Sequence, residues 1–430
     1  MAGVENLARC SSFEEELERV DPQRERFLLG KIKEFLEKIK PGDKALIACH
    51  PDADGYISGT FIKAFVDRFF KGQVGTGFCT DELKTQEFHD KAKDFKYVMT
   101  GDLWIDEAEE RQKGLRALLR QGTNIKVLDH HDKAFPDLDP SEIGKMLASR
   151  PKYTPTIPET LNQEFDPRTR GDITYVSPKR LGFHNTDSNK FTGALIIYKM
   201  LGQLVDLSDL GFLLPISAKG DCDAGKKYWP KLVEKYAGHD EEIAEIAGSL
   251  NFGKNLTLPA AERLMTWLAS MNGQRNSYKE IQQDDKLSDL RKLRAHVRGR
   301  VDKILEEGVI IKRRFLHYHV TAKDEQAAKE GLNGDLNREL VLDVGLSEAL
   351  CEKAGREITI IVTQLRNGLH VCLKDDREDQ EHDMTEFAKY FGGGGHENAA
   401  GATWKIPSGW STEAVIAQFR SELKQIADSY

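Results

Sequence analysis

The sequence contains four short motifs in which aspartate and histidine lie close together. Their members are Asp52 and Asp54 in PDADG, Asp102 in TGDLWID, Asp129, His130 and His131 in VLDHHD, and Asp221 in KGDCDAG. One such motif alone is most often a solvated turn or a helix cap, but four of them indicate a shared site. Carboxylate oxygens combined with imidazole nitrogen suit Mn²⁺, iron, cobalt or zinc better than Ca²⁺ or hydrated Mg²⁺. Two such ions about 4 Å apart can activate water and neutralise phosphoryl oxygens, which predicts phosphate-ester chemistry.

The elements around these motifs must bring them to one place. The runs KALIACHPDADG, YVMTGDLWID and NIKVLDHHD are apolar and strand-like, and helical patterns follow the first two. Strand, acidic loop and helix form a βα unit, so we expect a mostly parallel sheet with the acidic loops at the carboxyl ends of its strands. The apolar run FLLPISAKGDCDAG predicts a further strand end at Asp221.

In this order, and with FGGGGHENAAG near the C-terminus, the motifs resemble motifs I to IV of the DHH phosphoesterases and the glycine-rich motif of the DHHA1 domain. The resemblance covers residues 44–225 and roughly 310–405. It implies an α/β fold in which a helical linker joins a mostly parallel-sheet DHH domain to a smaller α/β DHHA1 domain. With the helical patterns before and between these regions, the expected domains are a helical N-terminal extension at 1–40, a DHH catalytic domain at 41–250, a helical linker at 251–309 and a DHHA1 substrate-binding domain at 310–430. Within the DHH domain, residues 132–190 hold seven of the chain's 14 prolines, which predicts an irregular insertion.

The resemblance also implies a role for each motif residue. Asp52 would bind one metal ion and Asp54 the other, Asp102 would bridge the two, His130 and Asp221 would complete the second site, Asp129 would orient its neighbouring histidine, and His131 would donate to the scissile phosphate. Many members carry a metal-binding histidine four residues before the first aspartate, where this chain has Ala48. Whether His50, two residues before Asp52, is a ligand stays open.

A second group of residues is expected to contact the substrate. The run Gly392–Gly395 predicts a flexible loop whose backbone N–H groups approach a phosphate, since no Cβ blocks them. Substrate binding is assigned to Gly393, Gly394, Gly395, His396 and Arg366. The alternative for Arg366 is an exposed charge on an edge strand.

Composition limits the remaining functions. The net charge of −8 and the pI near 5.9 argue against a protein that coats duplex nucleic acid. No apolar run approaches the roughly 20 residues of a membrane span, the N-terminus does not resemble a signal peptide, and the six cysteines form no CxxC pair. We therefore expect a cytoplasmic protein without a membrane partner, either a monomer or a homodimer.

The favoured function is hydrolysis of phosphodiester or phosphomonoester bonds in short oligonucleotides or nucleotides. Two Mn²⁺ ions are the expected cofactors, with Mg²⁺ or Co²⁺ as alternatives. The expected partner is a nucleotide or a short single-stranded nucleic acid. Three other functions stay open: a RecJ-like 5′ to 3′ exonuclease on single-stranded DNA, a non-catalytic scaffold with the DHH fold, and a small-molecule pyrophosphatase.

Overall fold

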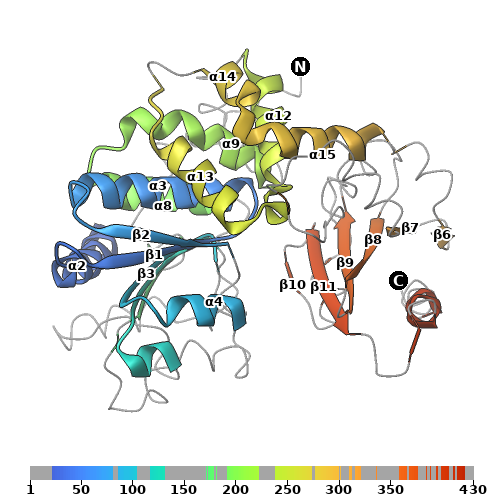
Figure 1. Ribbon diagram of the computed structural model, residues 1–430, viewed down its shortest axis with the longest axis horizontal. Helices are drawn as coiled ribbons and strands as arrows, with labels where there is room; N and C mark the ends of the chain where they lie inside the picture. Colours follow the sequence, from blue (N-terminus) through green and yellow to red (C-terminus); the bar gives the residue numbers. More distant parts are fainter. Residues whose placement is uncertain are drawn as a thin grey trace, which may run out of the picture. The chain divides into compact units, whose positions relative to one another are not determined.

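The structure is a computed structural model of the 430-residue chain (Figure 1). It describes residues 22–80, 86–103, 117–130, 171, 173–178, 181, 191–221, 238–273, 277–299, 301, 309–311, 315–320, 336, 358–365, 368–375, 384, 388, 394–395, 399–405, 410–411 and 414–421. The chain forms two compact units. The first contains residues 1–247 and 261–282, and the second contains residues 248–260 and 283–430.

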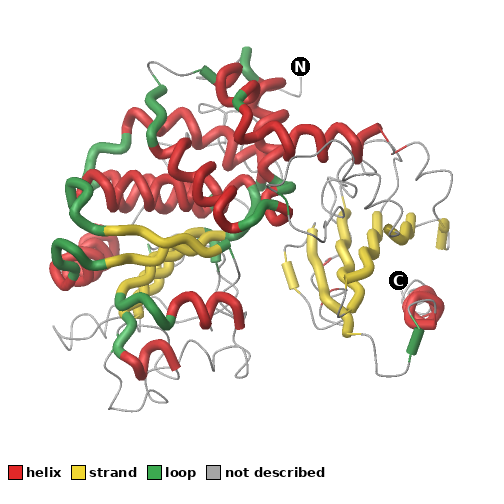
Figure 2. The backbone as a smooth tube through the Cα atoms, in the orientation of Figure 1, coloured by secondary structure: helices red, strands yellow, loops and turns green. Residues whose placement is uncertain are grey.

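A five-stranded sheet of entirely parallel strands forms the centre of the first unit (Figure 2). In spatial order its strands are β2 (Gly75–Cys79), β1 (Lys44–Cys49), β3 (Tyr97–Gly101), β4 (Asn124–Leu128) and β5 (Ile173–Val176). The three inner strands are almost completely buried, as expected where helices cover both faces of a parallel sheet. The predicted α/β class with a mostly parallel sheet is confirmed.

Helices cover the two faces of this sheet (Figure 1). On one face α3 (Ala53–Phe69) lies beside α8 (Gly193–Gly202), and α9 (Leu214–Gly220) packs against α3. On the other face α4 (Gln86–Ala92) adds Phe88 to a core cluster that contains Val98, Ile125 and Tyr175. The helix α2 (Pro22–Lys38) packs against β3, where the rings of Phe35 and Tyr97 meet edge to face at 5.8 Å.

The remaining helices follow in the sequence after α9. Those that the structure describes are α12 (Asp240–Leu250), α13 (Leu258–Ala269), α14 (Tyr278–Gln283) and α15 (Ser288–Gly299), with the 3₁₀ turns η4 (Gly253–Asn255) and η5 (Asp285–Leu287). A further 3₁₀ turn, η3 (Ser208–Leu213), directly precedes α9. None of the described helices combines the length and the apolar content that crossing a membrane requires.

The second unit contains a six-stranded mixed sheet. Its spatial order is β10 (Gly394–Gly395), β11 (Ala399–Lys405), β9 (Gly368–Asp375), β8 (Ile358–Leu365), β7 (Phe315–Val320) and β6 (Val309–Ile311). Among these described strands, only β7 and β8 pair in parallel. Alternate residues of β8 and β9, such as Ile360 and Val371, pack with Phe419 in its core. The strands β8 and β9 lie in the apolar runs EITIIVTQLR and GLHVCLKD.

Three local predictions are wrong. Asp221 does not follow a strand but ends α9, because the short apolar run before it fits a helix as well as a strand. The predicted irregular insertion at 132–190 contains the regular strand β5, which pairs with β4. In the glycine run, Gly394 and Gly395 form strand β10 rather than a free loop, because their backbone pairs with β11. The predicted domain boundaries stay predictions.

Candidate metal centre

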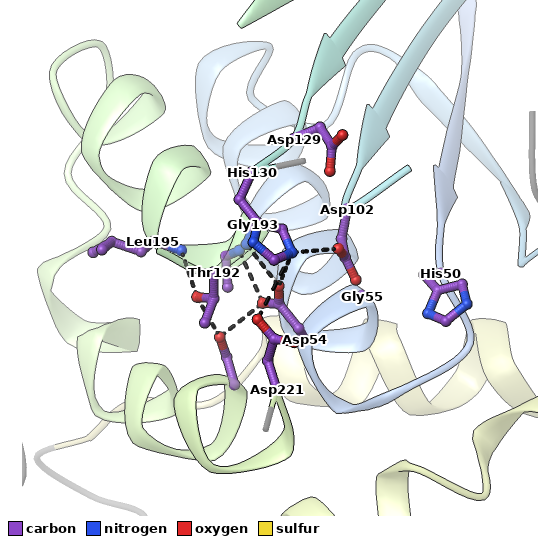
Figure 3. Close-up of polar contacts among 12 residues, drawn as sticks. His50, Asp54, Gly55, Asp102, Asp129, His130, Thr192, Gly193, Leu195 and Asp221 are labelled. Atoms are coloured by element: carbon purple, nitrogen blue, oxygen red, sulfur yellow. Dashed lines mark hydrogen bonds and ion pairs between the residues drawn. The ribbon is translucent and has the colours of Figure 1, made fainter. Parts of the chain in front are cut away.

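The carboxyl ends of β1, β3 and β4 carry the described motif residues to one edge of the sheet: Asp52, Asp54, Asp102, Asp129 and His130. Cys49 of β1 pairs with Gly101 of β3, and Gly101 pairs with Leu128 of β4, so the three strands end in register. The backbone hydrogen bonds between the strands continue one residue beyond their ends. The N–H of Asp102 donates to the carbonyl of Leu128, and the N–H of Asp129 donates to the carbonyl of Val176. The motif side chains therefore start from fixed positions on one edge (Figure 3).

His130 lies at the centre of the group and is almost completely buried. Its Nε2 atom is 3.2 Å from Asp102 Oδ1, 3.7 Å from Asp221 Oδ2 and 3.8 Å from Asp54 Oδ2 (Figure 3). Octahedral ligands bound at about 2.1 Å stand about 3 Å apart. Each of the three carboxylates thus lies near His130 Nε2 at a distance close to that between two ligands of one ion.

Asp54 is held by the N-terminus of α8. Its Oδ2 accepts from the backbone N of Gly193 at 2.6 Å, and its Oδ1 accepts from that of Ala194 at 3.0 Å and from Ser217 Oγ at 2.7 Å. Thr192 caps the same helix and forms a 2.7 Å hydrogen bond with Ser217. Free N–H groups and the helix dipole both favour a negative charge at this end, so these groups fix the orientation of Asp54 and oppose the effect of burial on its charge.

Asp102 has an unusual backbone conformation that needs close packing around it. Its φ of 56° lies in the left-handed region, which aspartate tolerates better than most residues. A Cβ atom on Gly193 would lie 2.8 Å from Asp102 Cβ and 3.1 Å from Ser58 Oγ. Glycine at 193 therefore permits the approach of α8 to Asp102.

Asp129 points away from solvent and is fully buried. Its Oδ2 accepts a 2.6 Å hydrogen bond from the hydroxyl of Tyr175, which lies on β5. Figure 3 shows the Asp129 carboxylate near His130 and Asp102. The sequence offers no signal for Tyr175, since 46 residues separate it from Asp129.

His50 and Asp52 form a more exposed part of the site. His50 Nδ1 lies 2.6 Å from Asp52 Oδ2, and the side chains are 41% and 33% exposed. Asp52 also caps α3 by accepting from the backbone N of Gly55 at 2.9 Å. Ligand atoms of His50, Asp52 and Asp102 lie within 4.8 Å of one another. The structure thus brings His50, which the sequence left open, into the site.

The electrostatics of the site show a crowding of negative charge. Burial raises the pKa of Asp102 well above its usual range, and the charges of Asp54 and Asp52 add to this effect. Burial also raises the pKa of Asp221, to about 7. The charge of His130 opposes this shift, and the charges of Asp54 and Asp52 add to it. Burial likewise raises the pKa of Asp54, although His130 opposes it.

His130 and Asp52 also have shifted pKa values, each because of an oppositely charged partner. Burial alone would lower the pKa of His130, but the charges of Asp221 and Asp102 and the hydrogen bond with Asp102 raise it well above its usual range. Burial alone would raise the pKa of Asp52, but the charge and hydrogen bond of His50 lower it. Buried carboxylates that compete for one histidine form a favourable environment for a divalent cation.

Among the residues that the structure describes, three groups could hold metal ions. They are His50, Asp52 and Asp102; Asp54, His130 and Asp221; and Asp102, Asp129 and His130. All five predicted metal ligands, Asp52, Asp54, Asp102, His130 and Asp221, are among them, and the mixture of carboxylate and imidazole fits the expected kind of ion. Of the other predicted site residues, His131, Arg366, Gly393 and His396 lie outside the described residues, and Gly394 and Gly395 belong to the second unit.

Comparisons with known proteins place the fold. No family model matches the chain, and no curated protein matches it either. Among solved structures, exonuclease RecJ bound to manganese is similar with a TM-score of 0.55 and 16% identity, over 96% of this chain and 95% of that one. RecJ from Thermus thermophilus with Mn²⁺ gives a TM-score of 0.57 and 15% identity, over 96% of this chain and 56% of that one. The DHH domain of a member of a ribosomal-protein family is similar with a TM-score of 0.56 and 15% identity, over 94% of this chain and 89% of that one.

These similarities confirm the resemblance inferred from the motifs: the chain has the fold of the DHH proteins. Identities of 15–16% establish the fold alone. The chemistry of the site must therefore be argued from its own residues.

Proposed function

We propose that the chain is a metal-dependent phosphoesterase that hydrolyses phosphodiester or phosphomonoester bonds of short oligonucleotides or nucleotides. The observation that carries this proposal is the convergence of Asp54, Asp102 and Asp221 on Nε2 of His130, at distances between 3.2 and 3.8 Å. A buried group of this composition is costly without a cation and suited to one.

The site would hold two ions, with Mn²⁺ favoured. Asp54, His130 and Asp221 would hold one of them, and His50 and Asp52 the other. Asp102 would be shared, because its ligand atom lies within 4.8 Å of those of His50 and Asp52 and its Oδ1 lies 3.2 Å from Nε2 of His130. Ions bound there would polarise a phosphoryl group and lower the pKa of an attacking water.

The protein's own residues would fix this arrangement before substrate binds. The N-terminus of α8 holds Asp54, and the left-handed backbone at Asp102 directs its carboxylate to His130. Asp129 would orient the histidine motif. From the sequence resemblance, His131 would face the scissile phosphate, while Arg366 and Gly393–Gly395 with His396 would contact the substrate.

The similar structures support this proposal in two ways. The two RecJ structures described above contain manganese, and a third from Thermus thermophilus contains Mg²⁺, with a TM-score of 0.50. RecJ is named an exonuclease, which supports a nucleic acid or nucleotide as the substrate. For the same reason, activity as a RecJ-like 5′ to 3′ exonuclease is the second candidate function.

The decisive experiment measures Mn²⁺-dependent turnover of the purified chain on a labelled dinucleotide, adenosine bisphosphate, cyclic di-AMP and a long single-stranded DNA. We expect cleavage of the small substrates only. Progressive shortening of the long strand would instead support the exonuclease. If the chain turned over none of these substrates, the proposal would be overturned, and a non-catalytic scaffold would be the remaining function.

The matched control for this assay is Asp102→Asn. Asparagine also tolerates a positive φ, so this variant removes the charge while keeping the backbone. We expect turnover to fall by about 100-fold or more, because a shared metal ligand is lost. Unchanged Mn²⁺-dependent turnover would contradict the assignment of Asp102.

A further inference from the structure

We propose that Tyr175 is a positioning residue of the metal centre, acting through Asp129. The inference rests on the proposed function only in that the centre binds metal. It adds a residue from β5, a strand that lies far from the DHH motif in the sequence.

The contact between the two side chains is short and shielded from water. The hydroxyl of Tyr175 lies 2.6 Å from Asp129 Oδ2, and both residues have an exposed fraction of 0%. An ionised carboxylate only accepts hydrogen bonds, so the tyrosine hydroxyl is the donor. Hydrogen bonds to a charged group in a dry environment are stronger than neutral ones.

The backbone holds the same two strands together at this point. Leu128 pairs with Val176, and one residue further the N–H of Asp129 donates to the carbonyl of Val176 at 3.0 Å. Asp129 is therefore held by β5 twice, once through its backbone and once through its side chain. Its position relative to Tyr175 is rigid.

The surroundings of Tyr175 explain why its hydroxyl matters to Asp129. Tyr175 packs in the core cluster with Ile125 and Val127, which are alternate residues of β4. Asp129 continues this alternation just beyond the strand, on the apolar side. Without the hydroxyl, its Oδ2 would lose a donor in a place that water does not reach.

The geometry connects this contact to the metal centre. Ligand atoms of Asp129, Asp102 and His130 lie within 4.8 Å of one another. By fixing one oxygen of Asp129, Tyr175 fixes the rotation of the carboxylate and hence the place of its ligand atom relative to these two groups. Partners of this kind orient metal ligands and commonly alter metal affinity by about 10- to 100-fold.

The test compares Tyr175→Phe with Tyr97→Phe. Tyr97 is the matched control because it is also fully buried in the same sheet, and its hydroxyl donates to the carbonyl of Lys38 at 2.5 Å, outside the metal groups. Both variants keep the ring of a buried tyrosine and lose one hydrogen bond of its hydroxyl. Calorimetric Mn²⁺ binding to the full chain, freed of metal beforehand, is the primary measurement, and thermal unfolding without metal is the second.

We expect both variants to lower the unfolding midpoint, but only Tyr175→Phe to weaken Mn²⁺ binding, by about 10-fold or more. The effect must pass through Asp129, so Tyr175→Phe should add no further loss of Mn²⁺ affinity to Asp129→Ala. Equal Mn²⁺ affinity of the two phenylalanine variants, or additive losses with Asp129→Ala, would overturn the inference.

The binding measurement separates this inference from the proposed function. A wild-type chain that binds Mn²⁺ and hydrolyses no substrate would overturn the proposed function. The comparison of the two tyrosine variants would still decide the role of Tyr175, since it needs no turnover.

Discussion

Two buried threonines on strands of the first unit differ in their hydrogen bonding. Thr174 Oγ1 on β5 accepts a 2.5 Å hydrogen bond from the ammonium group of Lys126, whose side chain is almost completely buried. Thr100 on β3 is equally buried, but its hydroxyl has no hydrogen-bond partner among the described residues. A buried hydroxyl without a partner destabilises the folded state, whereas one that accepts from a charged group stabilises it.

The same substitution should therefore have opposite effects at these positions. We expect Thr100→Val to raise the free energy of unfolding by about 1 kcal/mol, since it replaces an unpaired hydroxyl with a methyl group of similar size. Thr174→Val should lower it by about 1–3 kcal/mol, because the Lys126 ammonium loses an acceptor. Equilibrium unfolding in urea measures both. A shift of the same sign in the two variants would show that the hydrogen bonding is not the cause.

The residue types and their spacing predicted much of the site. The motif aspartates and His130 do come together, because parallel strands end at one edge and each motif follows directly after its strand or helix. The groups that hold them could not be predicted in this way. Tyr175 is 46 residues from Asp129, and Ser217 is 163 residues from Asp54, so no local pattern connects either pair.

The first residue of helix α8, Gly193, contacts two aspartates of the metal centre. Gly193 donates to Asp54 and leaves no room for a side chain beside Asp102. Gly202 ends the same helix, and nothing described lies within 4 Å of a Cβ atom built there. The two glycines therefore form a matched pair for one substitution.

We expect Gly193→Ala to displace the N-terminus of α8 and to weaken Mn²⁺ binding by about 10-fold or more, because Asp54 loses its two backbone donors. Gly202→Ala should leave Mn²⁺ binding unchanged and stabilise the fold by up to about 1 kcal/mol, since alanine favours helix over glycine. Calorimetry and urea unfolding of both variants measure these effects. Normal Mn²⁺ affinity of Gly193→Ala would contradict the assigned role of α8.

At the scale of elements, strands with a strong apolar pattern and an acidic end were predicted, and strands without such a pattern were not. The strands β1, β3 and β4 each combine an apolar run with an acidic end. The strand β5 has only four residues, ITYV, inside a proline-rich segment, so no alternation is detectable. The two glycines of β10 have no side chain pattern at all, and their strand exists only through pairing with β11.

The first unit is not continuous in the sequence. Residues 261–282 belong to it although residues 248–260 belong to the second unit. Met265 is fully buried and its Sδ lies 3.6 Å from Cys49 Sγ, while the hydroxyl of Tyr278 donates to the carbonyl of Phe212 at 2.5 Å. The later segment thus completes the core of the first unit.

This arrangement predicts the result of truncation. A fragment of residues 1–247 lacks the segment around Met265 and should not unfold cooperatively. A fragment of residues 1–282 contains it and should unfold cooperatively and bind Mn²⁺. Urea unfolding and calorimetry compare the two fragments, and equal cooperativity would show that residues 261–282 are dispensable for the first unit.

The discontinuity also sets an order of events during synthesis. All described residues of the metal centre, up to Asp221, are translated before the segment that completes their unit. At about 5–20 residues per second, the ribosome needs roughly 2–7 s to add residues 248–282. During that interval the apolar site that later receives Met265 stays open on the nascent chain. We expect ribosome-associated chaperones to bind there, and their release to follow the emergence of α13 and α14 from the exit tunnel.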